Sequence, residues 1–153
     1  MVTSRPYIPA DIAAICGREY EREFDELARK SYADIFATGP AFTICDGERP
    51  VASGGVVPIW RHVGEAWLHL SPWFSAHPQT GCRMVRRLFR TILKQHEFHR
   101  IHAAIRAEML PNRRLVEYLG FREEVGALKC WAADKDYVMY AMTNEGKRLC
   151  LQR

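Results

Sequence analysis

The 153-residue chain predicts one α/β (α+β) domain, residues 1–153, with a mixed central sheet of about seven strands flanked by helices. Three observations favour this class. The length suits a single domain, the 48% apolar and 26% charged content is that of a globular protein, and the hydrophobic period alternates between helix and strand. The expected order is β-α-α-β-β-β-α-β-α-β-β, with a parallel, right-handed strand–helix–strand crossover at its centre.

The N-terminal part predicts a short strand over residues 5–8, followed by a helix that begins at Pro9-Ala10-Asp11. Proline suits a first helical turn, and aspartate suits the positive end of the helix dipole. A second helical stretch is expected from about Glu19 to Phe36, because its apolar residues recur every three to four positions.

The middle of the chain changes to a strand period. Residues 41–45 and 51–57 predict two strands joined by a hairpin loop over 46–50, where Asp-Gly is a strong turn signal. Gly54-Gly55 inside the second strand indicates a bulge or a close approach of another backbone. After a turn around 63–64, a further strand is expected over 65–70.

The clearest helical segment begins at Gly81, with an apolar face and a largely basic remainder. A buried strand is expected over residues 100–105, and a short helix begins at Pro111-Asn112. That helix ends at Gly120, which supplies the left-handed position that stops a helix. Residues 121–131 and 137–142 predict a final hairpin, whose exposed edge would suit pairing in a homodimer.

Composition excludes several classes of protein. The five cysteines are an odd number, widely scattered and without a Cys-x-x-Cys pair, which argues against a disulfide framework and a structural zinc site. No metal site is therefore expected, and reduced thiols fit a cytoplasmic protein. No apolar run is long enough for a membrane helix, and the N-terminus lacks the apolar region of a signal peptide. The net charge of 22 − 18 = +4 fits an anionic small ligand and is low for a nucleic-acid-binding protein.

Residues 112–124, Asn-Arg-Arg-Leu-Val-Glu-Tyr-Leu-Gly-Phe-Arg-Glu-Glu, resemble a recurring ending of the GNAT superfamily of CoA-dependent acyltransferases. Arg5-Pro6 with Ala10-Asp11-Ile12 is similar to the usual start of that family, and the likeness covers about residues 5–142. The resemblance implies direct transfer of an acetyl group from acetyl-CoA, as co-substrate, to an amine acceptor.

The family's fourth strand is followed by a loop of the pattern Arg/Gln-x-x-Gly-x-Gly/Ala, whose N–H groups hold the CoA pyrophosphate at a helix N-terminus. The matching stretch is residues 71–84, where Gly81 can fill either glycine position but the partner positions then hold other residues. The alternative is a solvated basic helix face and a plain core strand. Cys82 has either a thiol pKa lowered by the helix N-terminus or a small apolar-face role. The resemblance implies cofactor contacts from Leu70 and Ser71, by their backbones, and from Gln79, Gly81, Cys82, Arg83, Met84, Arg87 and Asn112.

The catalytic groups are less well matched. The family's acid, a tyrosine four residues before the Gly-Phe stop, falls at Val116, and Tyr118 lies half a turn further on. An amine nucleophile must lose a proton to a nearby carboxylate or imidazole, directly or through water. The candidate catalytic residues are therefore Glu65, His69, Glu108 and Tyr118. The structural alternative for the bases is a strand-edge carboxylate and a half-buried histidine.

These departures keep a second class open, a catalytically degenerate GNAT-like binding or assembly protein similar to phage-encoded ones. A third interpretation, nucleic-acid binding through the arginines of residues 83–94, is disfavoured by the low net charge.

Overall fold

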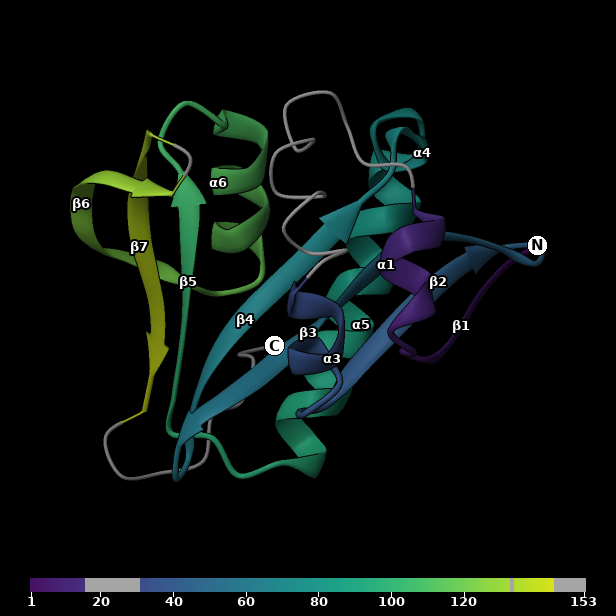
Figure 1. The fold of residues 1–153 in the computed structure, drawn as a ribbon, viewed down its shortest axis with the longest axis horizontal. Coiled ribbons are helices and arrows are strands. Elements are labelled where there is room, and N and C mark those ends of the chain that lie inside the picture. The colour runs from purple at the N-terminus through teal and green to yellow at the C-terminus, as the bar shows by residue number, and fades with distance from the viewer. Residues whose placement is uncertain (16–30, 133, 145–153) are drawn as a thin grey trace. The chain divides into compact units, whose positions relative to one another are not determined.

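The computed structural model describes residues 1–15, 31–132 and 134–144, and its strands form one seven-stranded sheet in the order β1-β2-β3-β4-β5-β7-β6 (Figure 1). The strands are β1 (Val2–Pro6), β2 (Ala41–Asp46), β3 (Arg49–Trp60), β4 (Val63–Leu70), β5 (Arg100–Arg106), β6 (Arg122–Ala132) and β7 (Lys135–Thr143). The helices are α1 (Ala10–Ala14), α3 (Ala33–Phe36), α4 (Pro72–Ala76), α5 (Pro78–Gln95) and α6 (Leu110–Tyr118). The predicted mixed sheet with flanking helices is confirmed. Most of the predicted second helix, residues 19–36, lies outside the described residues.

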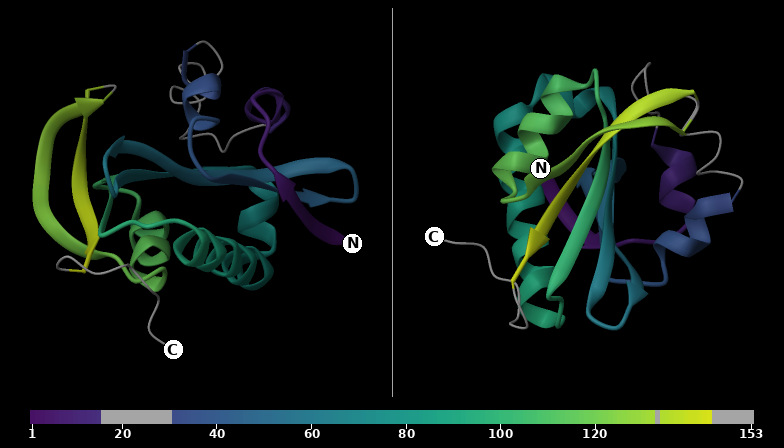
Figure 2. Two further views of the ribbon diagram at one scale, coloured as in Figure 1. Left: turned by 90° about the horizontal axis from the view of Figure 1, so that it is seen from below. Right: turned by 90° about the vertical axis from the view of Figure 1, so that its left-hand side faces the viewer.

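The chain divides into two compact units, Met1–Pro58 with Ala66–Leu88, and Ile59–Glu65 with Phe89–Arg153. In the first unit β2 pairs antiparallel with both β1 and β3. Helices α1 and α3 lie on one face of these strands and the start of α5 lies on the other (Figure 2). In the described residues, no helix combines the length and apolar character that crossing a membrane needs.

The glycine pair in β3 lies where another chain segment comes close. A Cβ added at Gly54 would lie 2.6 Å from Leu68 Cδ1, and one added at Gly55 would lie 2.4 Å from the Pro40 carbonyl oxygen. Both distances are shorter than a van der Waals contact, so the predicted close approach is confirmed. The bulge lies elsewhere in β3: Ile44 pairs with Ala52 and Cys45 pairs with Pro50, so Val51 is the extra residue.

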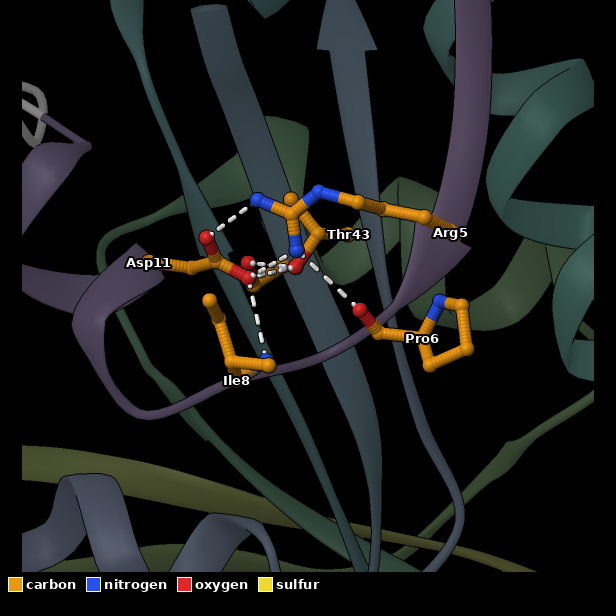
Figure 3. Close-up of polar contacts among 6 residues, drawn as sticks. Arg5, Pro6, Ile8, Asp11 and Thr43 are labelled. Atoms are coloured by element: carbon orange, nitrogen blue, oxygen red, sulfur yellow. Dashed lines mark hydrogen bonds and ion pairs between the residues drawn. The ribbon is translucent and has the colours of Figure 1, made fainter.

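The buried carboxylate of Asp11 ties α1 to the sheet (Figure 3). Arg5 Nη1 donates to Asp11 Oδ2 at 2.8 Å and Arg5 Nη2 donates to Oδ1 at 2.5 Å. The Ile8 N–H and the Thr43 hydroxyl also donate to Oδ2, at 3.1 and 2.6 Å. Since Thr43 gives its proton to Asp11, the Ser53 hydroxyl donates to Thr43 at 2.9 Å. The network therefore joins β1, α1, β2 and β3.

An aromatic cluster fills the space under α1 and α3 in the first unit. Tyr7, Ile12 and Phe36 are buried together, and the half-buried Trp67 packs against them. The Phe36 and Trp67 rings stack with centroids 4.1 Å apart, and Tyr7 meets Trp67 edge-on at 5.1 Å. Tyr7 also donates its hydroxyl to the Ala33 carbonyl, which fixes α3.

In the second unit β5 is the central strand. It pairs in parallel with the start of β4, from Val63–Arg100 to Glu65–His102, and antiparallel with β7 along its whole length. The edge strand β6 pairs with β7 through three register shifts, and Ala127 and Cys130 on β6 have positive φ. Such irregularities twist an edge strand and protect it against pairing with another chain.

The end of α6 confirms the predicted stop. The Gly120 N–H donates to the Glu117 carbonyl and the Phe121 N–H donates to the Val116 carbonyl, which is the Schellman pattern. Gly120 has φ +97°, and the side chains of Phe121 and Val116 are both buried. A residue with a Cβ would be strained at this position.

Several predicted boundaries are wrong. The first strand covers residues 2–6 and not 5–8, and the turn before β4 is at 61–62 and not 63–64, where His62 has φ +64°. The segment expected as a loop before Gly81 contains α4 and the first turn of α5. Pro72 and Pro78 each occupy a first helical turn, where the missing N–H is not needed.

We expect Asp11→Asn to lower the free energy of unfolding by about 2 kcal/mol at neutral pH, because the Arg5 guanidinium loses its charged partner in a half-exposed ion pair. Burial alone would raise the pKa of Asp11, but the hydrogen bonds from Arg5, Thr43 and the Ile8 N–H lower it. A lowered folded-state pKa contributes stability above the unfolded value of about 3.9, which is lost as the pH falls through the folded value. Urea unfolding between pH 2 and 7 should therefore show a shallower acid decline in the variant than in the wild type. Parallel curves would contradict this account of Asp11.

Gly120→Ala should destabilise the chain by about 1–2 kcal/mol, because alanine is strained at positive φ. Urea unfolding measures the loss. Gly126→Ala is the control, since an added Cβ there meets its nearest neighbour at an ordinary 3.5 Å. Equal stabilities of the two variants would contradict a role for Gly120 in ending α6.

Candidate functional site

The end of β4 leads directly into the segment where a phosphate loop was expected. Leu70 and Ser71 are almost completely buried, with 2% and 1% of their surface exposed. The Ser71 N–H donates to the Val51 carbonyl, and the Ser71 carbonyl accepts from the Phe74 N–H. The Ser71 backbone thus already has protein partners on both sides. Its buried Oγ has no hydrogen-bond partner within the described residues.

Gly81 lies inside α5, where its N–H donates to the His77 carbonyl at 2.9 Å. A Cβ at this position would lie 2.6 Å from the ring of Phe74, which is buried between α4 and α5. The lack of a side chain at Gly81 therefore lets α4 pack against α5. Its amide is used by the helix, so it is not one of the donors that α5 leaves open.

The N–H groups of α5 that have no partner within the helix belong to the residues just before Gly81. The first N–H groups of a helix have no partner within the helix, and at α5 these belong to Gln79 and Thr80, since Pro78 has none. Gln79, Thr80, Arg83 and Arg87 are all exposed. Positions 80, 83 and 87 lie on one side of a helix, so α5 presents two arginines along the face that begins at its positive end.

Two other predicted cofactor residues differ in environment. Met84 is half-buried, and its Sδ accepts from Arg87 Nη2 at 3.3 Å. Burial raises the pKa of the Cys82 thiol. The alternative of a Cys82 pKa lowered by the helix N-terminus is therefore wrong, and Cys82 packs as a small apolar residue.

The candidate catalytic residues are divided between the two units. His69, in the first unit, is almost completely buried. In the second unit Glu65 lies in register with His102 on β5. Glu108 follows the other end of β5. The strand extends about 13 Å from His102 to Arg106, at 3.3 Å per residue, so Glu65 and Glu108 lie near opposite ends of it. Arg106 donates to Glu108 Oε1 from Nε and Nη2, at 3.1 and 2.7 Å.

Helix α6 carries the remaining predicted residues. Val116 is buried and Tyr118 is 43% exposed near the helix end, so they point to different environments. Asn112 is half-buried in the first turn. In the described residues no group of three His, Cys, Asp or Glu side chains could hold a metal ion.

A polar network around Tyr140 was not foreseen from the sequence. Arg113 Nε donates to the Tyr140 hydroxyl at 2.9 Å, and that hydroxyl donates to Glu117 Oε1 at 3.2 Å. Arg113 Nη2 also pairs with Glu123 at 3.0 Å. Tyr140 is fully buried, and burial raises the pKa of its phenol. The network fixes α6 on β7, and Tyr140 is a core residue.

Solved structures share this fold over nearly the whole chain. An acetyltransferase of the GNAT family from Bacillus anthracis is 19% identical, covers 94% of this chain and 95% of its own, and superposes with a TM-score of 0.69. The ribosomal-protein-S5-alanine acetyltransferase from Vibrio fischeri is 15% identical over 97% and 96%, with a TM-score of 0.68. A variant of the spermidine N-acetyltransferase from Vibrio cholerae is 17% identical over 93% of each chain, with a TM-score of 0.64.

No protein-family model and no curated protein sequence matches the chain. The likeness is therefore one of fold: the chain has the fold of the GNAT acetyltransferases, as the sequence resemblance predicted.

We predict that Gly81→Ala destabilises the chain by about 1 kcal/mol. Overpacking against the Phe74 ring costs about 1–3 kcal/mol, which exceeds the gain of ~1 kcal/mol from replacing a helical glycine. Urea unfolding of the single variant and of Gly81→Ala with Phe74→Leu checks this, since the smaller partner should recover part of the loss. The neighbouring exposed change Thr80→Ala is the control, and a stabilising Gly81→Ala would contradict the packing role.

Proposed function

We propose that the chain is an N-acyltransferase that transfers an acetyl group from acetyl-CoA to an amine. A fold can host several functions, so the shared fold supports this proposal without deciding it. The observation that carries it is the start of α5. This helix follows β4 through α4, leaves the N–H groups of Gln79 and Thr80 open, and exposes Arg83 and Arg87 along the same face.

That helix start suits the phosphates of CoA. Helix N-termini bind anions through open N–H groups and the positive end of the dipole, and arginine adds charge-assisted hydrogen bonds to phosphate oxygens. The pantetheine amides would pair with the backbone at the end of β4. The Ser71 N–H already donates to the Val51 carbonyl. We therefore assign the hydrogen bonds with the pantetheine amides to the backbone of Leu70 and to the second lone pair of the Ser71 carbonyl oxygen.

Acetyl-CoA supplies the activated thioester when bound, and the protein's share of the reaction is to hold donor and acceptor in the right geometry. Positioning of this kind can supply most of the rate of a direct transfer. Position 116 holds a buried valine and not a tyrosine that could protonate the leaving thiolate, and Tyr118 is an exposed residue near the end of α6. The leaving thiolate would then take its proton from the attacking amine or from water.

A second candidate function is a GNAT-like binding or assembly protein without catalysis. Two observations favour it: the Gly81 amide is bonded within α5, and a buried Val116 takes the place of the acid. We also propose a cytoplasmic location, in keeping with the free thiols of Cys45, Cys82 and Cys130. A homodimer stays a prediction, and the register shifts of β6 count against pairing at that edge.

Acetyl-CoA should stabilise the full chain against thermal unfolding by ~2.7 kcal/mol at 100 times its Kd. Arg83→Gln and Arg87→Gln should each weaken binding about fivefold, a loss of ~1 kcal/mol. Lys94→Gln, an exposed cation near the other end of the same helix, removes the same charge and should leave binding unchanged. Differential scanning fluorimetry at several acetyl-CoA concentrations measures the binding of acetyl-CoA to the wild type and to each of the three variants.

The absence of any shift at millimolar acetyl-CoA would contradict the enzyme proposal. A steeply salt-dependent shift with oligonucleotides instead would favour nucleic-acid binding through the same arginines.

A further inference from the structure

Glu65 is an unusual carboxylate in the described part of the chain. Its side chain is half-buried on β4, and no hydrogen bond or ion pair from a described residue reaches it. Every other carboxylate there either has such a partner or is exposed to solvent. A partly desolvated carboxylate without a partner is unfavourable unless a cation or a proton joins it.

His102 is the neighbour of Glu65 on the next strand. The two residues are Cα partners in the parallel pairing of β4 with β5, and they form the last pair of that register. Partners in a sheet project to the same face. His102 is half-buried, and its Nδ1 is fully buried with no hydrogen-bond partner within the described residues. Two partly buried titratable groups thus lie side by side without satisfied polar contacts.

The surrounding charges of this face are already neutralised. Arg100, two residues before His102, is bonded through both terminal nitrogens to Glu124 of β6, at 2.9 and 2.5 Å. The hydrogen bond from Arg100 lowers the pKa of Glu124 by more than burial raises it, and the charge of His102 lowers that pKa further. Strand β7 contributes Ala141 opposite His102. Two carboxylates, Glu65 and Glu124, therefore lie near the His102 imidazole, and Glu65 is the one that receives no hydrogen bond or ion pair from a described residue.

Buried polar groups without partners are uncommon in native proteins, and they gather where a ligand completes them. A cationic group that donates hydrogen bonds is the partner that suits this site best, because the site offers a carboxylate and an imidazole nitrogen as acceptors. A protonated amine has both properties.

We infer that Glu65 and His102 form the binding site for the ammonium group of the acceptor, with His102 as its proton acceptor. This assignment rests on the proposed acetyl transfer and names the residues that select a cationic amine. Glu65 attracts the ammonium ion and balances the imidazolium that forms on deprotonation.

The proton balance is complete with these groups. The ammonium nitrogen gives one proton to the neutral imidazole of His102, directly or through one water. The freed lone pair forms a bond to the thioester carbonyl carbon, and the C–S bond breaks. The amine nitrogen gives a second proton to the departing CoA thiolate. The products are the acetylated amine and CoA, and His102 returns its proton to solvent.

The test compares Glu65→Gln, His102→Gln and the double variant with Glu97→Gln, an exposed carboxylate of the same unit. Activity is measured as thiol release from acetyl-CoA with simple primary amines and peptides with free N-termini. Each site variant should lose at least tenfold in kcat/KM, while stabilisation by acetyl-CoA and the activity of Glu97→Gln stay at wild-type values. His102→Gln should also lose the acid limb of the pH profile, which a merely structural role would not remove.

The double variant should be little worse than the poorer single variant, because the two residues act as a unit. Thermal unfolding shows that each variant is folded, and Glu65→Asp should recover part of the activity. Wild-type activity in either glutamine variant would overturn the assignment.

A second measurement separates this assignment from the proposed function. Ethylammonium chloride is titrated into the full chain with 15N-labelled histidine, and the His102 ring signals are identified by their loss in His102→Gln. A saturable shift that disappears in Glu65→Gln supports the site even if acetyl-CoA does not bind. No shift in the wild type would overturn it even if acetyl transfer is observed.

Discussion

The first unit depends on one buried carboxylate. Asp11 accepts hydrogen bonds from a guanidinium, a hydroxyl and a backbone N–H, and these donors come from β1, β2 and the turn before α1. A charge of this kind is tolerated in a protein interior only when its partners are complete. The arrangement therefore fixes α1 against β2 and places Ile12 beside Tyr7 and Phe36. The aromatic packing under α1 and α3 follows from that placement.

A second constraint sets the start of α5. The Phe74 ring occupies the space that a side chain at position 81 would need, and the Gly81 N–H completes the first helical hydrogen bond. The donors that stay open are then those of Gln79 and Thr80, with Arg83 and Arg87 following along one face. The resemblance to the GNAT family led us to expect a phosphate loop that uses glycine amides, whereas α5 of this chain begins with proline, exposed polar residues and arginine. The glycine pattern is poorly matched because the one glycine of this segment, Gly81, lies inside the helix and packs against Phe74.

Local features were predictable from the sequence, and tertiary ones were not. The Gly120 stop and the Asp-Gly hairpin depend on a few adjacent residues, so their signals are complete within the segment. The sequence does not predict α4, because Pro72 and Pro78 suit a loop as well as the first turn of a helix. Asp11 was foreseen only as a residue near a helix start, since Arg5 and Thr43 reach it through the fold. His102 has no sequence motif. Its position beside Glu65 comes from the register of β4 with β5, and the alternation of Ile101, Ala103 and Ile105 was the only sequence sign that it faces the other side.

The most direct test of the central claim, acetyl transfer to an amine, is to follow the acetyl group itself. The full chain is incubated with [13C2]acetyl-CoA and a mixture of primary amines and peptides with free N-termini, and the products are analysed by mass spectrometry. We expect a labelled amide on at least one amine, formed in an amount equal to the CoA released. Binding of acetyl-CoA without any labelled amide, or release of CoA only by hydrolysis, would contradict it and would leave the GNAT fold of this chain as a binding scaffold.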